Sequence, residues 1–598
     1  MTAGSIRSAW FKQGPVYHIF PASFHDSNGD GVGDLKGVQS KLEYIASLGA
    51  KIVRLGPIFD SPQVDMGYDV SDYSTVYRPY GTKEDMENLI RATHGLGMRL
   101  ILDTPISHTS DQHAWFKESR LSKDNPKRNW YIWRPAKVSP QGERLPPNNW
   151  RSHLSDESAW EWDEDTQEYY LRLYSKGQPD LNWDCLDVRK AIYDTAFLPW
   201  LEAGANGFVV DLANLHNKPD DCKDAPITNP GSAYQTVSNI MANETSVSQY
   251  LDEINNILLE YGAIVVGYLP SVPGKDKDAQ LASAARLQVS IQTDAAHVGI
   301  DTTCRFDDLP EAFSLPKFTE AVGRIQDLVN NGQGWPTIFL ESQDLPRSVS
   351  RFIGTAATDH VLGAKMLAMM QSCLSGTLSI YQGQELGLLN APLETWTLDN
   401  YVDIEARHYI NKMQLQHDNS PGQTENTLRS LQRMSRDHAR IPMAWNAKLN
   451  NCGFSSISGN PPWMEMHPLA ATMNMRAQFH HERSVYNFWR RMFWIRNEHK
   501  DLLVYGAYKN MCPDHEGLFM FTKTSMDGRS RSLTVINTTA GERQWKTPGN
   551  AALGLPVYAI VDLKPLISTH WTPLARFCHG EGVPLSSYEG RIYLVETK

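Results

Sequence analysis

Eight short apolar runs, rich in Val, Ile, Leu and aromatic residues, recur along the first two thirds of the chain. We predict these runs as strands: Val16–Phe20, Ile52–Leu55, Met98–Asp103, Gly207–Asp211, Ala263–Gly267, Leu287–Gln292, Thr337–Glu341 and Thr377–Tyr381. Amphipathic stretches with helical spacing lie between them, such as Lys36–Leu48, Lys83–His94, Val188–Leu201 and Tyr250–Leu259. Strands that alternate with helices in this way indicate an α/β fold, and eight of them predict a parallel (β/α)8 or TIM barrel.

Two segments break this alternation and predict further units. Residues 109–185, rich in Trp, Asn, Pro and charge, separate the third and fourth strands and indicate a subdomain inserted over the barrel mouth. After about residue 500, short β-rich runs are separated by Gly and Pro: Gly517–Lys523, Leu533–Asn537, Val557–Val561 and Arg591–Val595. We therefore predict a barrel formed by residues 1–108 and 186–500, the insertion, and a C-terminal antiparallel, β-sandwich-like domain at 501–598.

The composition excludes several classes of partner. The 598 residues carry a net charge of −11 without a basic stripe, which argues against nucleic acid. The seven cysteines are scattered singly, which argues against a disulfide framework or a zinc site. The sequence contains no stretch of about 18 apolar residues, so we predict no membrane span. The first ten residues lack the apolar run of a secretory signal. We expect a cytoplasmic protein whose partner is a small molecule.

The working residues of such barrels lie at the carboxyl ends of the strands and on the loops that follow them. Polar or aromatic side chains at these positions are Asp65 and Tyr68 after the second strand, Ser107 and His108 after the third, Asp211 on the fourth, Tyr268 after the fifth, and Gln343 and Asp344 after the seventh. They are expected to converge on one pocket.

Together with further motifs, these strand ends resemble the α-amylase family of glycoside hydrolases (family 13), and most of all the cytosolic fungal maltases and oligo-1,6-glucosidases. The further motifs are Asp26–Asp34, Pro147–Trp150, Gln178–Trp183, Tyr381–Glu385 and Ser435–Arg440. The likeness extends over nearly the whole chain. It implies a sugar-cleaving site in which one carboxylate attacks the anomeric carbon and one carboxylic acid protonates the departing oxygen.

The resemblance assigns roles to several residues of this chain. Asp211 matches the nucleophile, and Asp344 matches a third carboxylate that holds sugar hydroxyls. Asp65, Tyr68 and His108 match residues that hold the non-reducing glucose. Arg440 matches an arginine close to the same sugar.

Four positions depart from the family pattern. Tyr268 stands where the general acid, a Glu, belongs, and Val209 stands where an Arg supports the nucleophile. Gln343 replaces a His before the third carboxylate, and Ser107 replaces an Asn. Two interpretations of Tyr268 stay open: a ring that fills the cleft, or a hydroxyl that donates a hydrogen bond to the leaving oxygen.

These departures predict impaired hydrolysis. A positioned general acid contributes about 10²–10⁴-fold in rate, and a Tyr hydroxyl, with a pKa of about 10, is a far weaker acid than a tuned carboxyl group. Without a neighbouring cation, the pKa of a partly buried Asp211 is expected to rise, which would make it a poorer nucleophile.

The segment Asp26–Asp34 has the donor pattern of a calcium site. Oxygen donors stand at alternate positions: the side chains of Asp26, Asn28, Asp30 and Asp34 and the carbonyl of Val32. A solvated acidic turn is the alternative. The resemblance supports a structural Ca²⁺ remote from the chemistry.

Three functions remain open from the sequence. The chain is a degenerate glucosidase, or pseudoenzyme, that binds a ligand or regulates. Alternatively, it performs non-hydrolytic chemistry in the old pocket, for example in a fungal secondary-metabolism pathway. The third option is a weak α-glucosidase or transglycosylase that acts on maltose- or isomaltose-type substrates.

Overall fold

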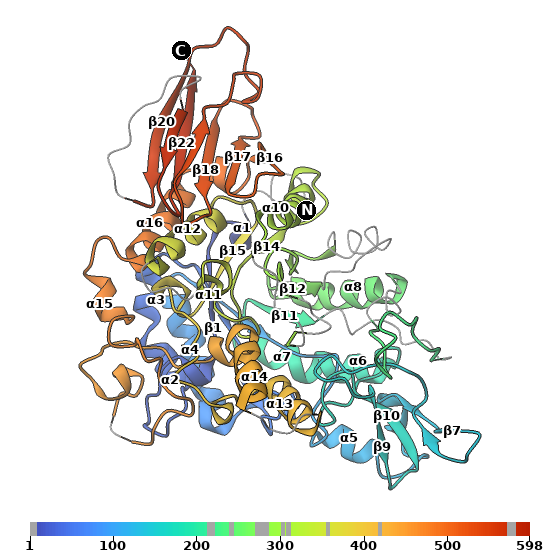
Figure 1. The fold of residues 1–598 in the computed structure, drawn as a ribbon. Helices are drawn as coiled ribbons and strands as arrows, with labels where there is room; N and C mark the ends of the chain where they lie inside the picture. The colour runs from blue at the N-terminus through green and yellow to red at the C-terminus, as the bar shows by residue number, and fades with distance from the viewer. Residues whose placement is uncertain are drawn as a thin grey trace.

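The computed structural model confirms the predicted barrel (Figure 1). It describes residues 9–211, 222–237, 244–269, 286–300, 305–306, 313–354, 359–416, 421–457, 459–570 and 582–597. The barrel strands are β1 (Val16–Ile19), β2 (Ile52–Leu55), β5 (Arg99–Asp103), β11 (Gly207–Asp211), β12 (Ile264–Leu269), β13 (Val289–Gln292), β14 (Pro336–Ile338) and β15 (Thr377–Tyr381). They pair in the closed order β1-β15-β14-β13-β12-β11-β5-β2, and each overlaps one of the eight predicted runs.

Alternation along the strands sorts side chains between the barrel interior and the helical layer. On β11, Val209 joins a cluster of inward-facing residues, whereas Phe208 and Val210 join the core beneath the helices. Because side chains on one face of a strand recur every second residue, Asp211 shares the inward face of Val209. The strand therefore carries its carboxylate to the rim of the barrel.

The helices form a layer around the barrel (Figure 1). They include α2 (Leu35–Ser40), α3 (Leu42–Leu48), α4 (Lys83–Gly95), α6 (Leu186–Ile192), α7 (Leu198–Glu202), α8 (Glu244–Glu260), α10 (Leu315–Asn330), α11 (Ser348–Phe352), α12 (His360–Ser372) and α16 (Val485–Glu498). On α10, Phe318, Val322 and Ile325 recur at helical spacing and are buried, which explains how this helix packs on the sheet. The Ser314 side chain caps its first turn by accepting from the Lys317 N–H.

The insertion builds its own small sheet. The strands β6 (Trp133–Arg134), β10 (Glu168–Leu171) and β9 (Trp160–Asp163) pair in that order. Its separate core includes Trp150, Trp160 and Leu171. The unit lies beside α13 (Ile404–Gln416), as Figure 1 shows. Isolated bridges such as that between His108 and Asp180 tie it to the loop after β5.

The C-terminal unit is antiparallel, as predicted. A five-stranded sheet contains β16 (Ala507–Asn510), β17 (Leu518–Thr524), β18 (Arg531–Asn537), β22 (Gly590–Thr597) and β20 (Val561–Ser568), and a second sheet pairs β19 (Arg543–Lys546) with β21 (Gly582–Leu585). The strand predicted at Val557–Val561 is wrong, because Val557 and Ile560 are exposed and pairing begins only at Val561. Within the described ranges, no helix is long and apolar enough to span a membrane.

Candidate active site

Asp211 and Tyr268 lie side by side at the rim of the barrel. They are Cα partners in the parallel pairing of β11 with β12, and both are partly exposed. Burial of the phenol, together with the nearby carboxylates of Asp344 and Asp211, raises the pKa of Tyr268 above its ordinary value. The rest of β12, Ile-Val-Val-Gly before Tyr268 and Leu after it, carries no carboxyl group. Tyr268 is therefore a neutral phenol and a weak proton donor.

The barrel interior holds an arginine on β2, whereas the family pattern implies one at position 209 on β11. Val209 is the Cα partner of Asp103 on β5, but the carboxylate of Asp103 is bound from the opposite side by Arg54 of β2. The Arg54 guanidinium donates to both oxygens of Asp103 at 2.6 and 2.8 Å. Arg54 and Val209 also line a small interior cavity of about 20 Å³. Sequence reasoning missed Arg54, although a lone charge in the strand Ile52–Leu55 is a signal that could have identified it.

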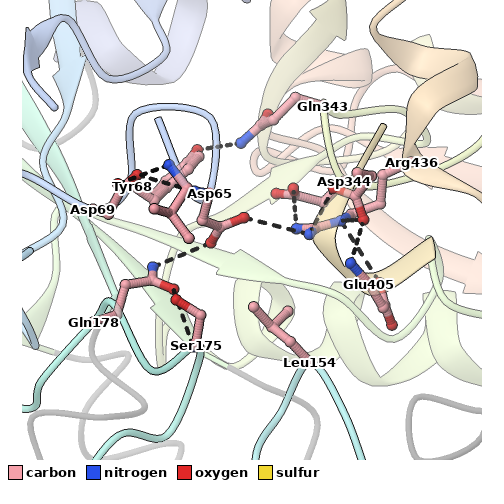
Figure 2. Close-up of polar contacts among 12 residues, drawn as sticks. Asp65, Tyr68, Asp69, Leu154, Ser175, Gln178, Gln343, Asp344, Glu405 and Arg436 are labelled. Atoms are coloured by element: carbon pink, nitrogen blue, oxygen red, sulfur yellow. Dashed lines mark hydrogen bonds and ion pairs between the residues drawn. The ribbon is translucent and has the colours of Figure 1, made fainter. Parts of the chain in front are cut away.

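Arg436 links the carboxylates of the pocket (Figure 2). Its guanidinium lies 3.4 Å from Asp65, 3.3 Å from Asp344 and 2.8 Å from Asp403. Burial raises the pKa of Asp65, and Arg436 opposes that rise. The pocket therefore holds fixed carboxylate oxygens, which suit the hydroxyl groups of a sugar.

Arg440, which the sequence singled out, lies behind this layer. It is fully buried, and its guanidinium lies 2.6 Å from Asp403 and 3.4 Å from Asp344. Burial disfavours the charged carboxylate of Asp403, but Arg436 and Arg440 outweigh it and lower the pKa of Asp403. Sequence reasoning missed Arg436, because the motif Ser435–Arg440 contains both arginines and its spacing does not say which one reaches the pocket.

Tyr68 forms hydrogen bonds with both His108 and Gln343. The Tyr68 hydroxyl donates to Asp103 at 3.2 Å and accepts from the Gln343 amide. Figure 2 shows the latter contact. The ring nitrogens of His108 lie 3.0 Å from the Tyr68 carbonyl and 2.9 Å from the hydroxyl of Ser107. The residues at the substituted positions, Ser107 and Gln343, are thus buried and hydrogen-bonded to His108 and Tyr68.

The insertion contributes further residues, of which Gln178 belongs to a motif named from the sequence and Tyr174 and Leu154 do not. The Gln178 amide donates to Asp65 at 3.2 Å, and the Tyr174 hydroxyl donates to Asp211 at 2.5 Å. Leu154 lies on the same side as Gln178 and Ser175 in Figure 2 and lines a neighbouring cavity. Tyr174 and Leu154 come from loops with no local pattern that places them near the barrel strands.

A cavity of about 490 Å³, called here the vestibule, has a volume that suits a small molecule. Asp65, Asp211, Tyr268 and Asp344 are not among the residues that line it. Its lining comes from the insertion, from α13 and from the Arg305 segment, and includes Leu154, Arg305, Glu405 and His408. Arg305 and Glu405 pair at 3.2 Å, and Glu405 also lies 3.6 Å from Arg436. Glu405 therefore links the lining of the vestibule to Arg436.

The predicted calcium segment forms a tight turn. The buried carboxylate of Asp26 accepts from the N–H groups of Asn28, Gly29 and Gly31, and Asp34 caps α2 by accepting from the Gly37 N–H. In the part of the chain that the structure describes, no three His, Cys, Asp or Glu side chains gather closely enough to hold a metal ion. A calcium ion here would also need the side-chain oxygen of Asn28 and the carbonyl of Val32, which are chemically suitable donors.

A closed (β/α)8 barrel with Asp65, Asp211 and Asp344 gathered around its mouth has the architecture of a barrel glycosidase. The chain belongs to the α-amylase family: the family described as "Alpha amylase, catalytic domain" matches residues 18–506.

Among curated relatives, an alpha-glucosidase of Candida albicans is 38% identical over 593 residues, which cover 98% of this chain and 99% of that protein. An oligo-1,6-glucosidase of Saccharomyces cerevisiae is 39% identical over 549 residues, with coverage of 91% and 92%. Among solved structures, a trehalulose synthase mutant in complex with Tris has a TM-score of 0.86 at 30% identity, with coverage of 98% and 100%. An isomaltulose synthase mutant from Erwinia rhapontici in complex with sucrose also has a TM-score of 0.86 at 30% identity, with coverage of 98% and 99%.

Proposed function

We propose that this chain binds an α-glucoside-type small molecule at the barrel mouth and breaks glycosidic bonds far more slowly than an ordinary α-glucosidase. The observation that carries the proposal is the position of Tyr268, which is the Cα partner of Asp211 and has a raised pKa. A leaving alkoxide needs a proton in the transition state, and a neutral phenol of this kind supplies it poorly.

The rest of the pocket supports recognition of a ligand. Asp65, Arg436 and Asp344 form a continuous polar surface. We propose that the retained pocket serves ligand binding or regulation, or non-hydrolytic chemistry in a biosynthetic pathway. A cytoplasmic location is part of this proposal, as in the maltases that the sequence resembles.

Weak α-glucosidase or transglycosylase activity is the second candidate. It is supported by the names of the relatives and by the retention of Asp211 and Asp344. In this case Tyr268 would donate a hydrogen bond to the leaving oxygen, and cleavage would be slow and confined to good leaving groups.

Titration calorimetry with isomaltose tests ligand binding. We expect a saturable binding isotherm whose heat does not continue after equilibration. Asp65→Asn is expected to weaken binding by about 10-fold or more, because a charged hydrogen-bond acceptor is lost. Asp527→Asn, at an exposed turn of the C-terminal unit, is the control and should bind like the wild type. A steady heat of hydrolysis, or no binding at all, would contradict the proposal.

Calcium is a separate proposal for the segment Asp26–Asp34. An excess of Ca²⁺ is expected to raise the Tm of the chelator-treated protein by about 2 °C or more, since a ligand that binds only the folded state stabilises it. The double variant Asn28→Ala/Asp30→Ala should lose this response in differential scanning calorimetry, while Asp527→Asn retains it. An unchanged Tm in the wild type would identify the segment as a solvated turn.

A further inference from the structure

The Tyr174 hydroxyl lies against the carboxylate of Asp211, with 2.5 Å between Oη and Oδ2. Such short O–H···O⁻ contacts are typical of charge-assisted hydrogen bonds, which are about twice as strong as neutral ones. Tyr174 follows β10 in the insertion, whereas Asp211 ends a barrel strand. The inserted unit thus delivers a hydrogen-bond donor to the nucleophile position.

The surroundings of Tyr174 hold its ring in place. The hydroxyl of Ser152 donates to the Tyr174 carbonyl at 2.6 Å. The rings of His108 and His153 contact that of Tyr174, with centroids 5.0 and 5.4 Å from its own. Burial, and then the Asp211 carboxylate, raise the pKa of Tyr174 well above its ordinary value, so that the hydroxyl keeps its proton and acts as a donor.

We propose that Tyr174 is a positioning residue that keeps Asp211 an ionised nucleophile, and that the chain therefore still accepts a glucosyl group on Asp211 from donors whose leaving group departs without a proton. A hydrogen bond to the charged form of a carboxyl group favours that form. Tyr174 thereby supplies the support that an apolar Val209 does not give. The inference rests on the proposed function, in which Tyr268 fails as an acid but the pocket still binds a glucoside.

α-Glucosyl fluoride is the simplest donor of this class. A carboxylate oxygen of Asp211 attacks the anomeric carbon, the C–F bond breaks, and fluoride leaves with the bonding electrons. The product is a glucosyl ester of Asp211. Azide, an anionic acceptor that needs no base, then attacks the same carbon, and the electron pair of the ester bond returns to Asp211. No proton moves in either step, so Tyr268 is not needed.

The first experiment incubates the full chain with α-glucosyl fluoride, with and without azide. We expect fluoride release, an increase in intact mass by one glucosyl group that maps to Asp211, and production of glucosyl azide when azide is present. Asp211→Asn should show none of these. No fluoride release above that of Asp211→Asn would overturn the inference and leave the proposed function standing. Rapid cleavage of isomaltose by the same preparation would instead contradict the proposed function.

A second experiment isolates Tyr174. Tyr174→Phe removes only the hydroxyl and is expected to lower the maximal rate of fluoride release by about 10- to 100-fold. The concentration of α-glucosyl fluoride that gives half of the maximal rate is expected to stay nearly unchanged. Tyr170→Phe is the matched control. Its hydroxyl donates to the Lys176 carbonyl and not to the pocket, so the wild-type rate is expected. Equal maximal rates for Tyr174→Phe and wild type, or a change in the half-saturating concentration alone, would show that Tyr174 does not support Asp211.

Discussion

A variant that restores the acid and the strand cation is expected to hydrolyse isomaltose about 10²–10⁴-fold faster than the wild type. It combines Tyr268→Glu, Gln343→His and Val209→Arg with Arg54→Leu. The carboxyl group introduced at position 268 would stand beside Asp211, because the two strands pair at these positions. The measurement is kcat/KM from the release of glucose by the purified proteins.

The Arg54→Leu change is needed because of the barrel interior. Val209 and Arg54 line the same cavity of about 20 Å³, so Val209→Arg alone would place two guanidinium groups beside one carboxylate, that of Asp103. Overpacking of a filled core costs about 1–3 kcal/mol, and the like charges add to that cost. Moving the cation from β2 to β11 keeps one arginine for Asp103, which is the Cα partner of position 209.

The matched control carries Gln at position 268 in the same background. Gln has nearly the shape of Glu but cannot donate a proton to a leaving alkoxide, and we expect no gain in rate. Equal gains for the Glu and Gln variants would contradict the role assigned to position 268. Failure of a folded Glu variant to gain activity would show that the pocket differs from a working glucosidase beyond these four positions.

Much of the barrel could be predicted from the sequence, because each strand is an apolar run whose burial needs no distant partner to identify it. Lys36–Leu48 was predicted as one helix and is two, since the backbone at Lys41 leaves the helical region between α2 and α3. The run Val557–Val561 has β-like composition, yet Val557 and Ile560 face solvent. Local composition does not report whether a neighbouring strand is present.

Some residues of the candidate site could likewise be predicted from the sequence, and others could not. Asp211 and Tyr268 stand at the carboxyl ends of β11 and β12 and Asp344 follows β14, so the barrel topology places them at the mouth. Tyr174 lies in a loop and Arg436 begins a short 3-10 helix, and their positions depend on packing between segments far apart in the sequence. The support of Asp211 by Tyr174 could therefore not be foreseen, and the sequence-based expectation of a poorly ionised Asp211 remains a prediction that the glucosyl fluoride experiment examines.

The rate at which the wild-type protein cleaves a glucoside is expected to depend strongly on the leaving group. The deficit in kcat/KM relative to an ordinary α-glucosidase should be largest for maltose and isomaltose, because their leaving sugars need protonation. It should shrink for an aryl α-glucoside with a nitrophenyl leaving group, because that phenolate departs without full protonation. A deficit equal for both substrate types would point to poor binding or a protonated Asp211 and would contradict the proposed role of Tyr268 as a weak proton donor.

The central claim is that the barrel mouth lacks an effective proton donor for glycoside cleavage. Its most direct test is kcat/KM for isomaltose and maltose, measured beside the Candida albicans alpha-glucosidase that is 38% identical to this chain. We predict values at least about 100-fold below those of that enzyme. Comparable values for the two proteins would contradict the claim.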